Sequence, residues 1–126
     1  MNYRIGIVAL DSKAGGIMRV SFLGRGGSAD GDCPTLYATD RGSYLVQGWR
    51  TTRPETVEIP HLLTGFAEPE MYIGATMTDT GRGTFRLDGT PVTDPEMLAQ
   101  LTIAEHEAAV EVPKKRRTFY GGVETG

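Results

Sequence analysis

Two stretches of the chain share one residue pattern, and this repeat decides the expected fold. Residues 41–55 read RGSYLVQGWRTTRPE, and residues 82–96 read RGTFRLDGTPVTDPE, at a constant offset of 41 residues. The identical positions are Arg41/Arg82, Gly42/Gly83, Gly48/Gly89, Thr52/Thr93, Pro54/Pro95 and Glu55/Glu96. Two copies are too few for a solenoid, so the repeat predicts a single pseudo-symmetric domain.

Related segments also flank the two copies. Thr39-Asp40 precedes the first copy, and Thr78-Asp79 precedes the second with two extra residues between them. A V-E-[I/V]-P segment follows each copy, at 57–60 and at 110–113, after a longer interval in the second. We therefore expect one domain over 1–113 that contains two related units, about 33–60 and 71–113, with an insert in the second.

The patterns in and around the repeat are typical of β-hairpins. Asp and Gly residues, which favour tight turns, separate strand-like runs in both copies. The expected strands are 18–23, 33–38, 43–49, 57–59, 71–77, 84–87 and 108–112. Consecutive runs on either side of each turn should pair, 33–38 with 43–49 and 71–77 with 84–87. The expected fold class is mainly β (α+β), a small, barrel-like antiparallel sheet with pseudo-repeat hairpins and one short helix.

The helix is expected over residues 93–101. Thr93 or Asp94 can cap its N-terminus, Pro95 suits the first helical position, and Thr93 with Glu96 fits a capping box. The first copy has a similar start, but a β-branched run follows it, so no helix is expected there.

Composition and charge limit the classes of protein. The 126 residues, 39% hydrophobic and 23% charged, suit one globular domain, and 17 glycines indicate many turns. The net charge of −3 argues against a dedicated nucleic-acid-binding domain. The lone Cys33 allows no intrachain disulfide or cysteine-clustered zinc site, and residues 1–10 form no membrane span or clear signal peptide. We expect a cytoplasmic protein.

The sequence contains no recognisable pattern of catalytic or metal-ligating residues. The glycine-rich loop 24–32 could hold an anion or Ca²⁺, but it lacks the flanking pattern of either site and is interpreted as a solvated linker. His106, between Glu105 and Glu107, is interpreted as part of a solvated surface run, and His61 ends the first unit. We predict no catalytic residues, no metal and no cofactor.

Five residues of the repeat are candidates for an interaction surface. They are Trp49, Tyr44, Phe85, Arg41 and Arg82. Trp49 corresponds to Thr90 in the second copy, so the scaffold does not require a large ring there, and tryptophan is a frequent interface anchor. Ordinary core packing of Trp49 is the alternative interpretation.

The end of the chain carries a compact positive charge. Lys114, Lys115, Arg116 and Arg117 are followed by Phe119-Tyr120. Residues 114–126 are predicted to form a basic flexible tail, which either improves solubility or makes weak, salt-sensitive contacts with nucleic acid.

Residues 33–49, 92–101 and 107–113 resemble small actinobacterial accessory proteins of the BldB and WhiJ-associated type. In these similar proteins the matching pieces are nearly adjacent, whereas residues 50–91 separate them here. The resemblance implies a short non-enzymatic protein that pairs with a helix-turn-helix regulator.

Three functions remain open from the sequence. The leading hypothesis is a non-enzymatic protein-interaction or regulatory accessory module, whose partner is another protein or a second copy in a homodimer. A DNA-binding or antitoxin-like small β protein and a small-ligand-binding β barrel are the alternatives.

Overall fold

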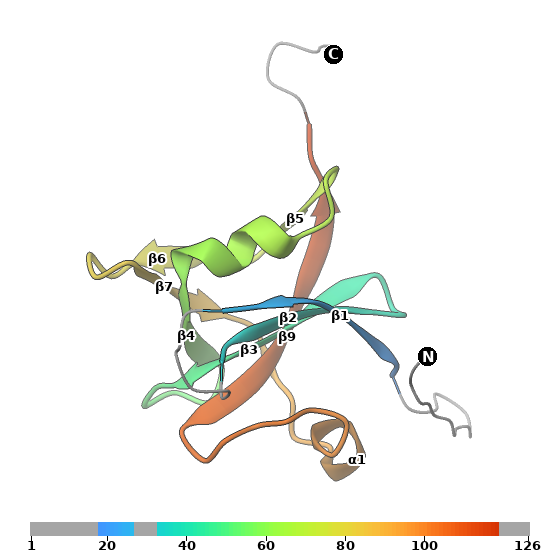
Figure 1. The fold of residues 1–126 in the computed structure, drawn as a ribbon, viewed down its shortest axis with the longest axis vertical. Helices are drawn as coiled ribbons and strands as arrows, with labels where there is room; N and C mark the ends of the chain where they lie inside the picture. Colours follow the sequence, from blue (N-terminus) through green and yellow to red (C-terminus); the bar gives the residue numbers. More distant parts are fainter. Residues whose placement is uncertain (1–17, 27–32, 119–126) are drawn as a thin grey trace.

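The longest strand, β9, connects the parts of a nine-stranded antiparallel sheet in the computed structural model, which describes residues 18–26 and 33–118 (Figure 1). The strands are β1 (Val20–Arg25), β2 (Thr35–Thr39), β3 (Ser43–Arg50), β4 (Thr56–Pro60), β5 (Met71–Ile73), β6 (Met77–Asp79), β7 (Thr84–Asp88), β8 (Thr90–Pro91) and β9 (Glu107–Arg116). The helices are the 3₁₀ helix η1 (His61–Phe66) and α1 (Pro95–Leu98). The mainly β prediction is confirmed, but the sheet does not close into a barrel.

The order of the sheet departs from the order of the chain at β7 and at β9. Strands β1, β2, β3, β4, β7 and β6 lie side by side in that order, and β9 pairs separately with β3, β5 and β8. Figure 1 shows β9 running diagonally through the molecule and extending past the other strands beside β5. Because β9 pairs with β3 of the first unit as well as with β5 and β8 of the second, the last strand of the second unit also completes the sheet of the first.

The two units exchange strands in matching register. Strand β3 of the first unit pairs with β9 of the second, and β7 of the second pairs with β4 of the first. The equivalent pairs are Ser43–Pro113 and Thr84–Pro60, Tyr44–Val112 and Phe85–Ile59, Leu45–Glu111 and Arg86–Glu58, and Val46–Val110 and Leu87–Val57. The 41-residue repeat therefore has a structural counterpart in the pairing of the strands.

Two equivalent glycines allow the backbones to approach closely where each unit folds onto itself. A Cβ on Gly48 would lie 2.7 Å from the Glu58 carbonyl oxygen, and one on Gly89 would lie 2.7 Å from that of Glu111. Both glycines face a V-E-[I/V] segment, which explains why the repeat keeps glycine beside that motif.

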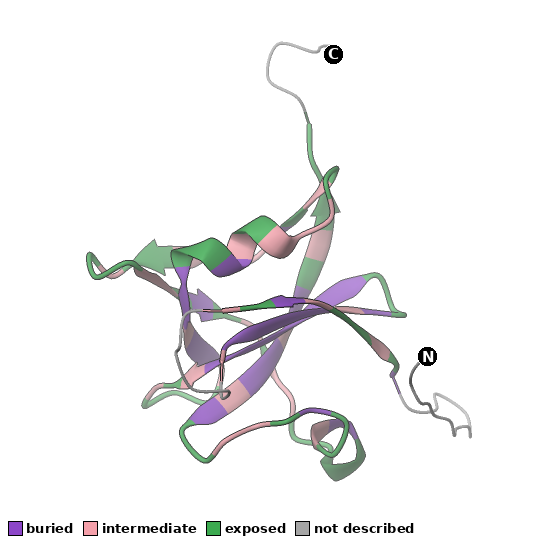
Figure 2. Cartoon of the chain, viewed as in Figure 1, coloured by how far each residue is buried: buried purple, intermediate pink, exposed green. Residues whose placement is uncertain are grey.

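The buried residues form two clusters, which Figure 2 shows concentrated in the central strands. The larger cluster contains Tyr44, Leu63 and Leu87, and the smaller one contains Leu45, Met97 and Leu101. Helix η1 contributes Leu63 to the first cluster, whereas α1 contributes Met97 to the second. Each short helix is thus held to the sheet by a buried apolar side chain.

Most predicted strands are present, but one expected hairpin is wrong. Residues 71–77 do not form a single strand, because β5 pairs with β9 and only β6 pairs with β7. Helix η1 was not expected. The expected helix is limited to α1, followed by a turn, and Asp94 rather than Thr93 caps it by accepting a 2.9 Å hydrogen bond from the Glu96 N–H.

The predicted flexible tail is also wrong for its first part. Lys114, Lys115 and Arg116 belong to β9 and pair with Ile73, Tyr72 and Met71 of β5. The charged run was predicted to be a tail because its strand partner, β5, has only three residues and could not be recognised from the sequence. Residues 1–10, most of the loop 24–32 and Phe119-Tyr120 lie outside the described residues.

Gly89→Ala is expected to lower the free energy of unfolding by about 1–3 kcal/mol, because the new methyl group must displace the backbone of β9. Gly65→Ala is the matched control, since a Cβ at Gly65 would meet no atom of the described residues within 4 Å. Urea denaturation followed by circular dichroism measures both. Equal stability of the two variants would contradict the close approach at Gly89.

Candidate functional site

The repeat places a hydroxyl, a carboxylate and an arginine together twice. The Thr84 hydroxyl donates a 2.6 Å hydrogen bond to Glu58, which also pairs with Arg82 at 2.8 Å. In the other unit the Ser43 hydroxyl donates a 2.6 Å hydrogen bond to Glu111, whose nearest Arg41 nitrogen is 3.9 Å away. Because both sets join strands of different units, we interpret them as structural links.

A second hydroxyl extends each set and corrects the alignment of the turns. The Thr39 and Ser43 hydroxyl oxygens are 2.5 Å apart, as are those of Thr80 and Thr84. Thr80, and not Thr78, is therefore the counterpart of Thr39. The offset of 41 residues continues through the turn without the two extra residues that the sequence suggested.

The Thr84 hydrogen bond has an electrostatic effect on Glu58. Together with Arg82 it lowers the pKa of the Glu58 carboxyl, because both groups stabilise the ionised form and outweigh the cost of partial burial. Glu58 therefore stabilises the fold above pH 4.5, the ordinary value, and this stabilisation is lost as the pH falls through the lower pKa of the folded state.

The structure does not assemble the five predicted interaction residues into one surface. Tyr44 is fully buried and its hydroxyl donates a 3.0 Å hydrogen bond to Glu68, so its assignment to a surface was wrong. Burial raises the pKa of Tyr44 to about 12. Trp49 and Phe85 are half-buried, and the Phe85 ring lies 4.2 Å from that of His61. Arg41 and Arg82 are exposed but form ion pairs with Glu111 and Glu58.

The basic residues at the end of β9 are partly neutralised. Lys114 lies 2.9 Å from Glu68 and over the Tyr44 ring, and Arg116 lies 2.8 Å from Glu70. Lys114 lowers the pKa of the Glu68 carboxyl. Lys115 and Arg117 are exposed and have no carboxylate within 4 Å among the described residues. Two of the four charges of this run are therefore paired within the described fold and two are not.

The Glu105-His106-Glu107 run is not a uniformly solvated surface. His106 and Glu105 are exposed, but Glu107 is completely buried. Its Oε1 accepts hydrogen bonds from Gln47 Nε2 at 2.9 Å and from the Ala104 N–H at 3.1 Å. Its Oε2 has no hydrogen-bond partner among the described residues. The sequence missed this burial because a single charged residue in a strand normally faces solvent.

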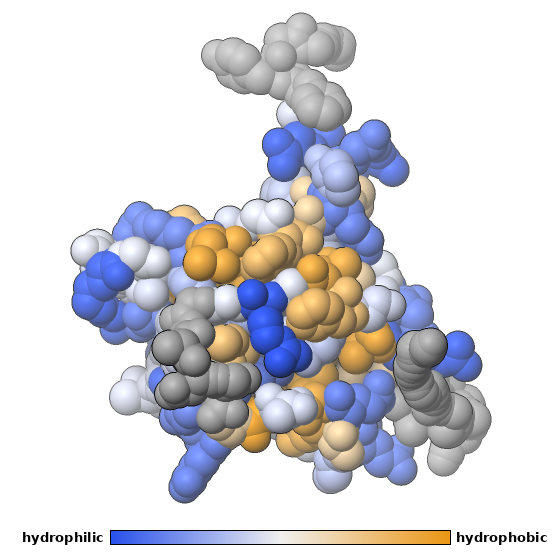
Figure 3. All heavy atoms as spheres, in the orientation of Figure 1, coloured by the Kyte–Doolittle hydropathy of each residue, from blue (hydrophilic) through white to orange (hydrophobic). Residues whose placement is uncertain are grey.

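One exposed apolar face was not predicted. Phe22 and Leu62 remain 55% and 52% exposed, and Figure 3 shows apolar atoms gathered over η1 and the neighbouring β1. The guanidinium of Arg25 lies 5.1 Å from the centre of the Phe22 ring. We call Phe22, Arg25 and Leu62 the η1–β1 face.

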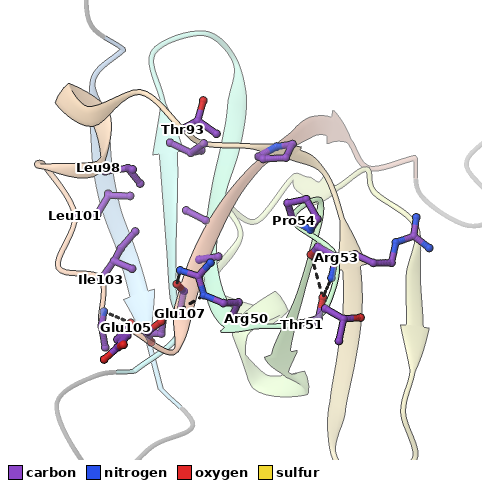
Figure 4. Close-up of a pocket in the computed structure, with 16 residues that line it drawn as sticks. Arg50, Thr51, Arg53, Pro54, Thr93, Leu98, Leu101, Ile103, Glu105 and Glu107 are labelled. Atoms are coloured by element: carbon purple, nitrogen blue, oxygen red, sulfur yellow. Dashed lines mark hydrogen bonds between the residues drawn. The ribbon is translucent and has the colours of Figure 1, made fainter.

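A pocket of about 730 Å³ lies between the α1 segment and the turn after β3. Figure 4 shows Leu98, Leu101 and Ile103 on one side, Thr51 and Pro54 on the other, and Arg50 with Glu107 between them. The sequence could not reveal this pocket, because its walls come from three segments that meet only in the folded chain.

Comparisons with protein-family models, with curated proteins and with solved structures find no match to this chain. The described residues include no helix with the length and apolarity needed to cross a membrane. They also contain no group of three or more His, Cys, Asp or Glu side chains arranged to hold a metal ion.

Thr84→Val is expected to raise the pKa of Glu58 toward 4.5, because the variant removes the hydroxyl that stabilises the carboxylate. It should also reduce the loss of stability between pH 6 and pH 3. Carboxyl ¹³C NMR titration measures the pKa, and Ser43→Ala, which removes the equivalent hydroxyl beside Glu111, should leave Glu58 unchanged. An unchanged Glu58 titration in Thr84→Val would contradict this origin.

Glu107→Ala is expected to lower the free energy of unfolding by about 1–3 kcal/mol, because the Ala104 N–H loses its side-chain acceptor and the buried Gln47 amide loses one of its two acceptors. Glu107→Gln keeps an oxygen at that position and should lose less than half as much. Thermal and urea unfolding compare the two variants. A Gln variant as unstable as the Ala variant would show that the fold needs the charge and not the acceptor.

Proposed function

We propose that the chain is a non-enzymatic protein-interaction module that binds another protein through the η1–β1 face. The exposure of Phe22 beside Arg25, with Leu62 exposed on the neighbouring η1, is the observation that carries this proposal. Large apolar side chains next to an arginine are typical of the residues that dominate binding energy at protein interfaces.

The face is held in place by the fold beneath it. Leu63 anchors η1 in the core and leaves the adjacent Leu62 outside, and Gly24 of β1 lies against the Phe66 ring of η1. A rigid arrangement loses little conformational entropy when a partner binds.

Side chains rather than backbone groups should make the contact. A register shift between Phe22 and Gly24 interrupts the pairing of β1 with β2. Such a bulge at the edge of a sheet disfavours the addition of another strand. The η1–β1 face therefore suits a partner that presents its own side chains.

The charge of Arg25 defines the chemistry of the partner. Among the described residues no carboxylate lies within 4 Å of Arg25, in contrast to Arg41 and Arg82. A partner protein with apolar side chains beside an Asp or Glu would complement the face. The resemblance to accessory proteins of helix-turn-helix regulators suggests such a regulator as the partner, in the cytoplasm, where the lone thiol of Cys33 remains reduced.

Affinity capture with the full chain tests the proposal. We expect proteins that bind the wild type to be lost with Phe22→Ser/Leu62→Ser and with Arg25→Glu. Tyr72→Ser, which alters a 43% exposed ring on β5, is the matched control and should retain them. Sedimentation of the purified chain then examines self-association.

Two results would contradict a heterologous protein partner at this face. One is the same set of captured proteins on all four baits. The other is a homodimer that the Phe22/Leu62 substitutions dissociate, since the face would then bind a second copy.

A further inference from the structure

The pocket beside α1 has an apolar wall of unusual origin. Leu98, Leu101 and Ile103 belong to the segment that the second unit contains and the first lacks. Pro54 and Pro91 add apolar surface from the two repeat copies. At about 730 Å³, the pocket is within the range of small-molecule sites.

Arg50 supplies a positive charge to the pocket. Its Nε donates to the Glu105 carbonyl at 3.3 Å and one terminal nitrogen donates to the Glu107 carbonyl at 2.9 Å. Both acceptors are backbone oxygens, so the guanidinium keeps its positive charge and further N–H groups. A carboxylate lies within 4 Å of several other arginines, namely Arg41, Arg53, Arg82, Arg86 and Arg116. None lies so close to Arg50 among the described residues.

The repeat does not explain why an arginine occupies position 50. Its counterpart in the second copy is Pro91, so the shared scaffold does not need an arginine at this position. Arg53 also lines the pocket, but it pairs with Glu55, and Figure 4 shows its side chain directed away from Leu98 and Leu101. The charge and the apolar wall of the pocket are thus both additions to the repeated fold.

We propose that this pocket binds a small amphipathic carboxylate, such as a medium-chain fatty acid. The carboxylate meets the guanidinium of Arg50, and the hydrocarbon lies against Leu98, Leu101 and Ile103. Arginine suits a carboxylate because its N–H groups form charge-assisted hydrogen bonds. None of the lining residues belongs to η1 or β1, so this site is separate from the η1–β1 face.

The carboxylates of Glu105 and Glu107 oppose this assignment, because both residues line the pocket and would attract an amine rather than a carboxylate. Glu107 is completely buried and its Oε1 accepts hydrogen bonds from Gln47 and Ala104, whereas Glu105 is exposed. Arg50 is fixed by two hydrogen bonds, whereas among the described residues no hydrogen bond or ion pair holds the carboxylate of Glu105. A fixed charge provides the stronger anchor.

Titration of the full chain with octanoate, octylamine and octanol, followed by ¹H–¹⁵N NMR, tests the proposal. Octanoate should bind most tightly and shift the amides of residues 98–109. Arg50→Gln should weaken octanoate about tenfold or more and leave octanol unchanged. Arg53→Gln is the matched control and should change octanoate binding less than twofold.

The octanol measurement separates a lost anchor from a damaged pocket. No binding of octanoate at millimolar concentration would overturn the proposal, as would tighter binding of octylamine. Equal weakening of octanoate and octanol in Arg50→Gln would show that the pocket recognises only hydrocarbon. Phe22→Ser/Leu62→Ser should bind octanoate like the wild type, so failure of the protein-interaction proposal would not affect this result.

Discussion

The exchange of strands between the two units is the constraint on which the rest of the structure depends. Strand β3 pairs with β9 along seven residue positions, and β7 pairs with β4 along five. Neither unit can complete its central pairing with its own residues, so the two must fold together. The hydrogen bond from Ser43 to Glu111 spans 68 positions of the sequence, and contacts over such distances favour slow, cooperative folding.

This exchange, with the turns and close approaches that accompany it, gives a physical reason for three of the six identical pairs of the repeat. Gly42 and Gly83 have positive φ angles of 75° and 86° in equivalent turns, and Arg41 and Arg82 lie in the same turns and pair with Glu111 and Glu58. Thr52/Thr93, Pro54/Pro95 and Glu55/Glu96 are different. These positions lead to α1 in the second unit but only to a turn in the first, and nothing in the structure explains why both copies retain them.

The sequence predicted features that depend on local patterns. Turn residues and alternating side chains located β2, β3, β4 and β7, and Asp94-Pro95 located the start of α1. Features that depend on distant partners were missed. The three residues of β5 form a strand only because β9 lies beside them, and Glu107 is buried only because Gln47 and Ala104 provide its hydrogen bonds. The same limit applies to the site, where Tyr44 was assigned to a surface although its ring belongs to the core.

Both surfaces to which we assign binding lie where the repeat is broken. Helix η1 follows β4 in the first unit, whereas in the second unit β9 continues straight to Arg116 at the equivalent point. The α1 segment exists only in the second unit, and it provides the apolar wall of the pocket. Residues shared by both copies stabilise the pairing of the exchanged strands. Glu58 and Glu111 accept hydrogen bonds across the units, and Gly48 and Gly89 allow the close backbone approach. Substitution there is costly for the fold, so new binding properties arise more readily on segments without a counterpart.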